Sequence, residues 1–206
     1  MHGRHLISML LIATLIFPLV AGSSLTGGVD KNPDESEVPF SIVERTSPSI
    51  DGKDWNFEIK MDDDAYANGT TLSITTQVCT NDGVCDRPLT CDHSGECDPD
   101  ATHGITIDGQ TYAITGFSPP SDHTYVNWRV IAEYEGGEEE NFPQGDWFKT
   151  WSSCWHIQKD GNKTWGGIDS TEDGCNISDE GGIIPGFVLP TILGSIVMAI
   201  AYYRRD

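Results

Sequence analysis

A continuous apolar run close to the C-terminus constrains this chain more than any other feature. It extends from Ile183 to Tyr203, a length of 21 residues. An α-helix rises about 1.5 Å per residue and needs roughly 20 apolar residues to cross the hydrocarbon core of a bilayer. We therefore expect residues 183–203 to form a transmembrane anchor. Arg204 and Arg205 follow the run. Because basic residues stay on the cytoplasmic side of a membrane helix, residues 204–206 are predicted to be a cytoplasmic tail.

The other end of the chain has the three parts of a secretory signal. Arg4 and His5 belong to a short basic leader, residues 6–20 are mostly apolar, and small residues occupy positions 21–24. This order predicts a signal peptide over residues 1–22 that is removed on export, and the alternative is a retained N-terminal membrane helix. The two ends together predict a single-pass cell-surface protein with its N-terminus outside and its C-terminus in the cytoplasm.

The charge balance narrows the classes of partner. The chain has 32 acidic and 12 basic side chains, which gives a formal net charge of −20. Nucleic-acid binding needs clustered Lys and Arg that face phosphate, so we expect no nucleic-acid partner. An acidic exterior suits a salty medium, divalent cations or basic partners, and net charge by itself also maintains solubility.

All six cysteines fall in the part that we expect to be exported. An even count in an oxidising compartment predicts three disulfides. Cys154 and Cys175 lie far from the other four along the sequence, so we expect them to pair with each other. The remaining four then pair among themselves, and both nested and sequential connectivities stay open: Cys79, Cys85, Cys91 and Cys97.

Carboxylates crowd the same cysteine-rich segment, which we define as residues 79–100. Hard oxygen ligands are what calcium takes, although the segment lacks the spacing of an EF-hand loop. Zinc is disfavoured because the cysteines are not closely paired as in structural zinc sites. A solvated loop closed by disulfides is the favoured interpretation. The candidate calcium ligands are Asp82, Asp86, Asp92, Glu96, Asp98 and Asp100.

Between the terminal runs, apolar residues alternate with polar ones. This period of two is seen in residues 55–61, 72–78 and 126–132, and Asp108-Gly109 is a two-residue hairpin signal between two further runs. Alternation of this kind predicts strands that bury one face. About seven short strands with frequent turns predict an all-β chain: a single antiparallel β-sandwich of the immunoglobulin-like class.

The segments around this sandwich follow from their composition. We expect a flexible leader over residues 23–38, the sandwich over 39–157 with residues 79–100 as an insertion, and an acidic stalk over 158–182. The stalk is rich in Gly, Asp, Asn, Ser and Thr. N-glycosylation triplets begin at Asn162 and Asn176, and a third begins at Asn68 in the sandwich.

Two segments resemble known families. Residues 124–132, followed by an acidic turn, resemble the penultimate strand of fibronectin-III-like domains, although Val126 takes the position where that family has an inward Tyr. At the tail, Pro185-Gly186-Phe187, the apolar run and the final Arg204-Arg205 resemble the PGF-CTERM sorting signal of archaeal surface proteins. That resemblance implies removal of the tail by an archaeosortase and attachment of the new end to a membrane lipid. The alternative is a plain single-span anchor.

Signatures of catalysis are missing from the sequence. It contains none of the common hydrolase, metalloprotease or nucleotide-binding motifs. Cys154 and His156 are spaced as a thiol and a base, but an exported cysteine with a partner is usually oxidised. The aromatic cluster of Trp147, Trp151, Trp155 and Trp165 favours core packing, and its alternative role is a surface that stacks on sugars or holds cations.

We therefore expect a non-catalytic, membrane-anchored cell-surface protein that acts in adhesion, recognition or envelope structure. The first alternative is an extracellular solute- or calcium-binding module, which would use either the acidic cysteine segment or the tryptophans. The second alternative is an envelope enzyme. No cofactor other than calcium is implied.

Overall fold

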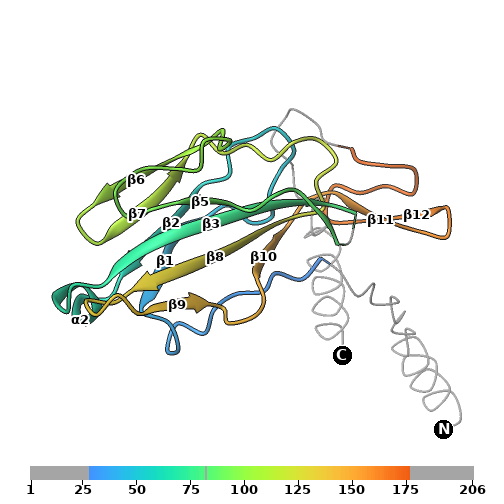
Figure 1. The fold of residues 1–206 in the computed structure, drawn as a ribbon. Coiled ribbons are helices and arrows are strands. Elements are labelled where there is room, and N and C mark those ends of the chain that lie inside the picture. The colour runs from blue at the N-terminus through green and yellow to red at the C-terminus, as the bar shows by residue number, and fades with distance from the viewer. Residues whose placement is uncertain (1–27, 82, 177–206) are drawn as a thin grey trace, which may run out of the picture. The chain divides into compact units, whose positions relative to one another are not determined.

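Two antiparallel sheets pack face to face in the computed structural model, which describes residues 28–81 and 83–176 (Figure 1). The predicted signal peptide, transmembrane anchor, cytoplasmic tail and sorting residues, together with Asp82, lie outside the described residues. Within the described ranges, the structure contains no helix that is both long and apolar enough to cross a bilayer. The prediction of an all-β chain with antiparallel sheets is confirmed for this part of the chain.

The first sheet has four strands in the order β1-β2-β7-β6. Their bounds are Phe40–Arg45 for β1, Phe57–Met61 for β2, Thr111–Thr115 for β7 and Gly104–Asp108 for β6. The predicted β6–β7 hairpin is present, and Asp108 pairs with Thr111. Its turn is therefore Gly109-Gln110, one residue later than Asp108-Gly109. Gly109 has a φ of +60°, which glycine adopts without steric strain.

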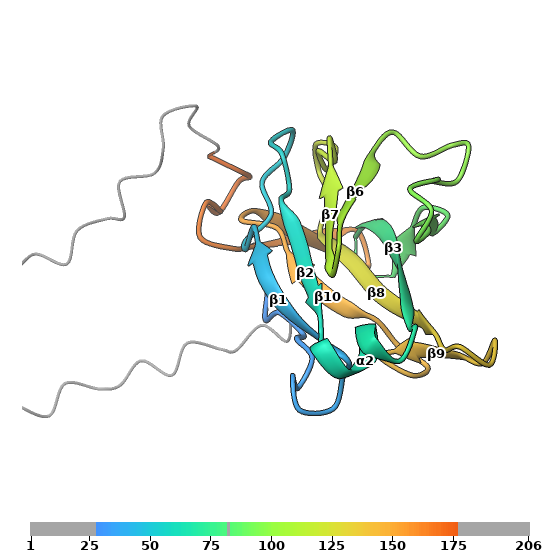
Figure 2. The same cartoon turned by 90° about the vertical axis from the view of Figure 1, so that its left-hand side faces the viewer.

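The second sheet is built around the long antiparallel pair β3 and β8, with β9 beside β8 (Figure 2). β5 pairs with β3. Its path is β10-β8-β3-β4, and the short helix α2 (Asp63–Ala67) lies between β2 and β3 in the chain. The strands are β3 (Thr71–Thr80), β4 (Val84–Cys85), β5 (Leu89–Cys91), β8 (Tyr125–Glu133), β9 (Glu139–Phe142) and β10 (Phe148–Trp151). Because β4 and β5 pair with β3, the cysteine-rich insertion extends the sheet.

The core lies between the two sheets and consists of the residues that the alternation predicts to face inward. Phe57 of β2 lies 4.5 Å from Trp128 of β8, measured between ring centroids, and Trp55 stacks on Phe57 at 5.0 Å. Ile59 and Val130 are fully buried in the same cluster. Full burial of such side chains contributes roughly 1.5–3 kcal/mol each, so this cluster is the main source of stability.

The predicted stalk is partly folded. Residues Trp155–Lys159 (β11) and Asn162–Gly166 (β12) form a two-stranded hairpin, and the compact unit continues as far as Cys175. The turn is Asp160-Gly161, whose φ angles of +52° and +80° suit a tight two-residue hairpin turn. The sequence expectation of a stalk over residues 158–182 was wrong for this hairpin, because Asp-Gly is itself a strong hairpin signal that the polar composition concealed.

The described part of the predicted flexible leader is also tied down. Asp30 accepts hydrogen bonds from the backbone N–H of Trp151 at 2.8 Å and from the guanidinium of Arg45 at 3.0 Å. Lys31 and Lys149 exchange two backbone hydrogen bonds at 3.0 and 2.9 Å. The expectation of a flexible segment therefore fails at residues 30 and 31, because the partly buried carboxylate of Asp30 and the backbone hydrogen bonds of Lys31 fix them to β10.

Candidate functional site

The six cysteines form three disulfides, and the described residues contain no free cysteine. The predicted Cys154–Cys175 pair is confirmed. The sequence left nested and sequential pairings open for the first four cysteines. The structure shows the sequential one, with the disulfides Cys79–Cys85 and Cys91–Cys97. Cys154 is thus oxidised, as expected for an exported cysteine with a partner, and it offers no free thiol to His156.

The acidic residues of the cysteine segment do not converge on one point in the described structure. Asp92 caps a local turn, and the hydroxyl of Ser94, which donates to it at 2.6 Å, lowers the pKa of Asp92. Asp98 accepts the backbone N–H of Thr90 at 2.8 Å, and Asp100 pairs with Arg87 at 3.1 Å. Nowhere in residues 28–81 and 83–176 do three or more potential ligands gather around a metal position. Asp86 and Glu96 belong to no such group either.

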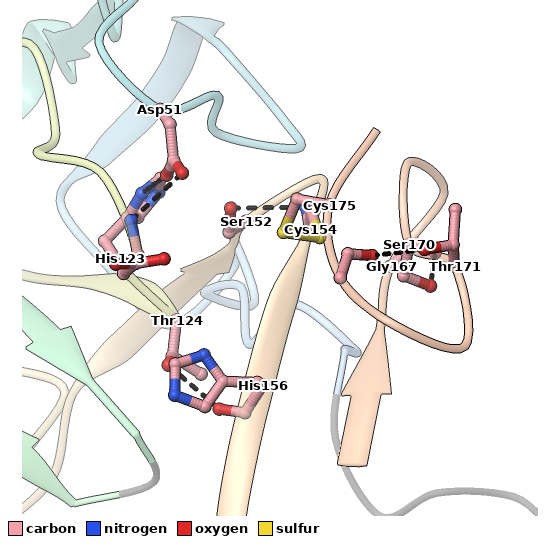
Figure 3. Close-up of a disulfide and its surroundings, with 12 residues drawn as sticks. Asp51, His123, Thr124, Ser152, Cys154, His156, Gly167, Ser170, Thr171 and Cys175 are labelled. Atoms are coloured by element: carbon pink, nitrogen blue, oxygen red, sulfur yellow. Dashed lines mark hydrogen bonds and ion pairs between the residues drawn. A yellow bond between two sulfur atoms is a disulfide. The ribbon is translucent and has the colours of Figure 1, made fainter. Parts of the chain in front are cut away.

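A hydrogen-bond chain joins three residues that the sequence analysis did not single out. Ser49 Oγ lies 2.7 Å from His123 Nε2. His123 Nδ1 in turn lies 2.5 Å from Asp51 Oδ1 (Figure 3). Ser49 and Asp51 lie between β1 and β2, whereas His123 lies between β7 and β8. This is the order of contacts found in Ser-His-Asp hydrolases. Because His123 is more than 70 positions from both Ser49 and Asp51, no local sequence motif identifies the three residues together. We call them the histidine clasp.

The environment of the histidine clasp is that of a structural element. Ser49 and His123 are fully buried. Ser49 Oγ also lies 3.3 Å from the carbonyl oxygen of Trp151, to which it donates, and Asp51 accepts the backbone N–H of Asp122 at 3.0 Å. The clasp therefore ties the β1–β2 loop to the β7–β8 loop and to the end of β10. In this conformation no substrate reaches Ser49.

A cavity of about 520 Å³ adjoins the histidine clasp, and its size is in the range of small-molecule sites. Pro48, next to Ser49 in the chain, lines it together with Trp151 and Trp155. Val29 and Ile168, each 80% exposed, lie at its edge. We call it the tryptophan pocket. Ile168 belongs to the loop that the Cys154–Cys175 disulfide closes (Figure 3), so this bond helps to fix one wall.

The four clustered tryptophans lie outside the main core. Trp147 and Trp151 share one face, as the alternation predicts, but this is the outer face of the six-stranded sheet, because Phe148 takes the inward position. Trp151 packs with Tyr125 and Trp155 in a second small cluster that the β11–β12 hairpin covers. Core packing is thus the role of Trp151 and Trp155, in a core that the sequence analysis did not foresee. Trp165 contacts His156 at 4.8 Å.

Outside these sites, one further histidine of the described residues is buried. His103 is 7% exposed, lies 3.3 Å from Thr76 Oγ1 through Nε2, and contacts the ring of Phe117. Burial lowers the pKa of His103, because the charged imidazolium is poorly solvated there. The three glycosylation acceptors Asn68, Asn162 and Asn176 are all exposed.

Known proteins were compared with the chain. No protein-family model matches it, and no curated protein sequence matches it.

Proposed function

We propose that this protein is a non-catalytic, membrane-anchored cell-surface protein that acts in adhesion, recognition or envelope structure. The closure of all six cysteines into three disulfides carries the proposal, because disulfides persist in oxidising compartments outside the cytosol. A small β-sandwich reinforced in this way is a common form of extracellular module. The acidic composition and the two apolar terminal runs give independent support from the sequence.

The proposed attachment follows the sequence at the C-terminus. Residues 183–203 hold the protein in the membrane, either as a permanent single span or, following the PGF-CTERM resemblance, until the tail is exchanged for a lipid near Pro185-Gly186-Phe187. The exposed acceptors Asn68, Asn162 and Asn176 carry glycans in this proposal. We propose that the sandwich lies outside the cell and that Arg204 and Arg205 lie inside.

The intact mass of the protein extracted from membranes tests these proposals in one measurement. The expected mass lacks residues 1–22 and six hydrogens, and it is increased by glycans. A further loss near residue 185 together with the mass of a lipid would identify the sorting route, whereas a retained residue 206 would identify the plain anchor. Free thiols on a protein recovered from the cytosol would contradict the proposal.

One observation favours a second candidate function, that of an envelope hydrolase. The histidine clasp has the contact order of a catalytic triad, with Ser49 in the position of the nucleophile. Because Ser49 is fully buried, this function requires the β1–β2 loop to move aside. A fluorophosphonate probe that labels the folded wild-type protein but not the Ser49→Ala variant would establish it. Absence of labelling under conditions that label a control serine hydrolase would exclude it.

A further inference from the structure

The outer face of the six-stranded sheet has a chemistry unlike the rest of this acidic chain. Register pairs Lys149, Asn127 and Gln77 across β10, β8 and β3, and it pairs Arg129 with Thr75 in the next row. These five positions alternate with the buried residues Val126, Trp128 and Val130, so their side chains lie on the side away from the core. Trp147 joins them just before β10. We call these six residues the amide face: Thr75, Gln77, Asn127, Arg129, Trp147 and Lys149.

The amide face differs in charge from the outer face of the four-stranded sheet. The amide face has two cations, Arg129 and Lys149, and no Asp or Glu in either row. On the four-stranded sheet, the outward positions of β1, β2 and β6 include Glu44, Glu58 and Asp108, against the single cation Lys60. On a chain with a net charge of −20, the amide face therefore repels an anion less than the outer face of the four-stranded sheet does.

An aromatic ring and a guanidinium are stacked on this face. The guanidinium carbon of Arg129 lies 3.6 Å from the centroid of the Trp147 ring, and both side chains are half-buried. The neighbouring carboxylate of Asp146 forms an ion pair with Lys31, at 2.6 Å between Nζ and Oδ2. No ion pair joins Arg129 or Lys149 to a carboxylate within the described ranges. A guanidinium held flat in this way offers a planar set of donors to an incoming carboxylate.

Two polar atoms of the amide face lack a hydrogen-bond partner. They are Oδ1 of Asn127, a residue that is only 5% exposed, and Nε of Arg129. The other side chains hold each other in place, because Asn127 Nδ2 donates to Gln77 Oε1 at 3.0 Å. Buried polar atoms are nearly always satisfied in folded proteins. Both atoms are screened from solvent, so a ligand would meet this face through the half-buried side chains of Arg129, Trp147 and Lys149.

We infer that the amide face binds an anionic glycan, meaning a chain of sugar rings that bear carboxylate groups. The Trp147 ring gives a flat surface for a sugar ring, and the half-buried cations of Arg129 and Lys149 attract the carboxylates. A nucleic acid also combines anions with flat rings. However, it carries one charge per 1.7 Å or so of duplex, and two cations on a strongly acidic protein do not offset that density.

This inference rests on the proposed recognition function, to which it gives a partner class. Its test is binding in solution of the purified full-length chain in neutral detergent. The probes are oligogalacturonate, a neutral galactose oligomer of equal length and oligothymidylate, and the readout is titration calorimetry. The variants are Arg129→Gln and Trp147→Ala. Lys60→Gln is the matched control, because Lys60 is an exposed lysine on the outer face of the opposite sheet.

We expect the wild-type chain to bind oligogalacturonate and to bind it more weakly as salt is added, because salt screens exposed charges. Loss of either Arg129 or Trp147 should weaken binding by about tenfold, the effect of losing one charge-assisted or stacking contact. Lys60→Gln should leave the affinity unchanged. If Arg129→Gln does not reach the native unfolding midpoint, Lys149→Gln replaces it.

Four results would overturn the inference: no binding of oligogalacturonate, equal binding of the neutral oligomer, tighter binding of oligothymidylate, or an equal loss in Lys60→Gln. None of them bears on membrane attachment, which the intact mass and the thiol state decide separately.

Discussion

Trp155 and Gly166 are register partners in the β11–β12 hairpin, and the indole of Trp155 lies directly against the glycine backbone. A Cβ added at Gly166 would lie 2.3 Å from Cζ2 of that ring. The contact explains how a large aromatic residue is 3% exposed beside a hairpin of only five residues per strand. The hairpin thus covers the second cluster and lines the tryptophan pocket at the same time.

Replacing this glycine should therefore destabilise the protein. We expect Gly166→Ala to lower the free energy of unfolding by about 1–3 kcal/mol, the usual effect of overpacking. Urea unfolding followed by tryptophan fluorescence measures it. Gly136→Ala is the matched control, since a Cβ there meets nothing within 4 Å, and it should change stability by no more than about 0.5 kcal/mol. Equal effects of the two substitutions would contradict the packing described for Trp155.

The histidine clasp makes a second prediction about stability. Asp51→Ala removes the carboxylate that faces Nδ1 of the fully buried His123. Leaving a buried hydrogen-bonding group without its partner typically costs about 1–3 kcal/mol, and we expect a loss near the upper end because His123 is fully buried. Asp54→Ala, in the same loop but exposed, should cost less than about 1 kcal/mol. Chemical denaturation of both variants checks the difference, and similar losses would refute the clasp.

Acid should destabilise the protein through His103. Burial lowers the pKa of this residue in the folded state below its ordinary value of 6.5. The unfolded chain therefore binds the proton more tightly, so stability is lost as the pH falls through 6.5 and the loss is complete below the folded-state pKa. Between pH 7 and pH 5 the His103→Gln variant should lose less stability than the wild type. His93→Gln, which alters an exposed histidine, should behave like the wild type, and identical pH profiles for all three proteins would contradict this account.

The disulfides should differ in how much they stabilise. Cys154–Cys175 spans 21 residues and Cys91–Cys97 spans 6. From loop-closure entropy, we expect the Cys154→Ser/Cys175→Ser double variant to lose about 3 kcal/mol and the Cys91→Ser/Cys97→Ser variant about 2 kcal/mol. Urea midpoints of the two double variants measure this order. The reverse order would show that native-state packing of the sulfurs outweighs chain entropy.

The strands were largely predictable because each long one shows a period of two. The alternation at Phe57, Ile59 and Met61 places these residues in the core, where they are found. In β10 it was harder to predict which side chains face the core, because large aromatic residues occur on both sides of the strand. Phe148 faces inward, so Trp147 and Trp151 face outward. Hydrophobicity alone could not decide between the two sides, because the outer side is itself partly covered by a hairpin.

The candidate sites were not predictable in the same way. Ser49 and His123 are 74 positions apart, and only the return of the chain through two sheets brings them together. The amide face consists of ordinary polar residues whose significance depends on strand register. By contrast, Cys154–Cys175 was predicted because spacing alone isolates those two cysteines.

The Cys154–Cys175 bond also decides how the domain responds to force. Tension that enters at Asn176 passes through the disulfide directly to Cys154 and the end of β10, because Cys175 is the adjoining residue. The β11–β12 hairpin lies inside the closed loop and is bypassed. While the disulfide is intact, tension cannot unfold the hairpin and lengthen the chain between the domain and Asn176. Reduction of this disulfide would transmit the force through residues 155–174 instead, so the hairpin would bear the tension and could unfold.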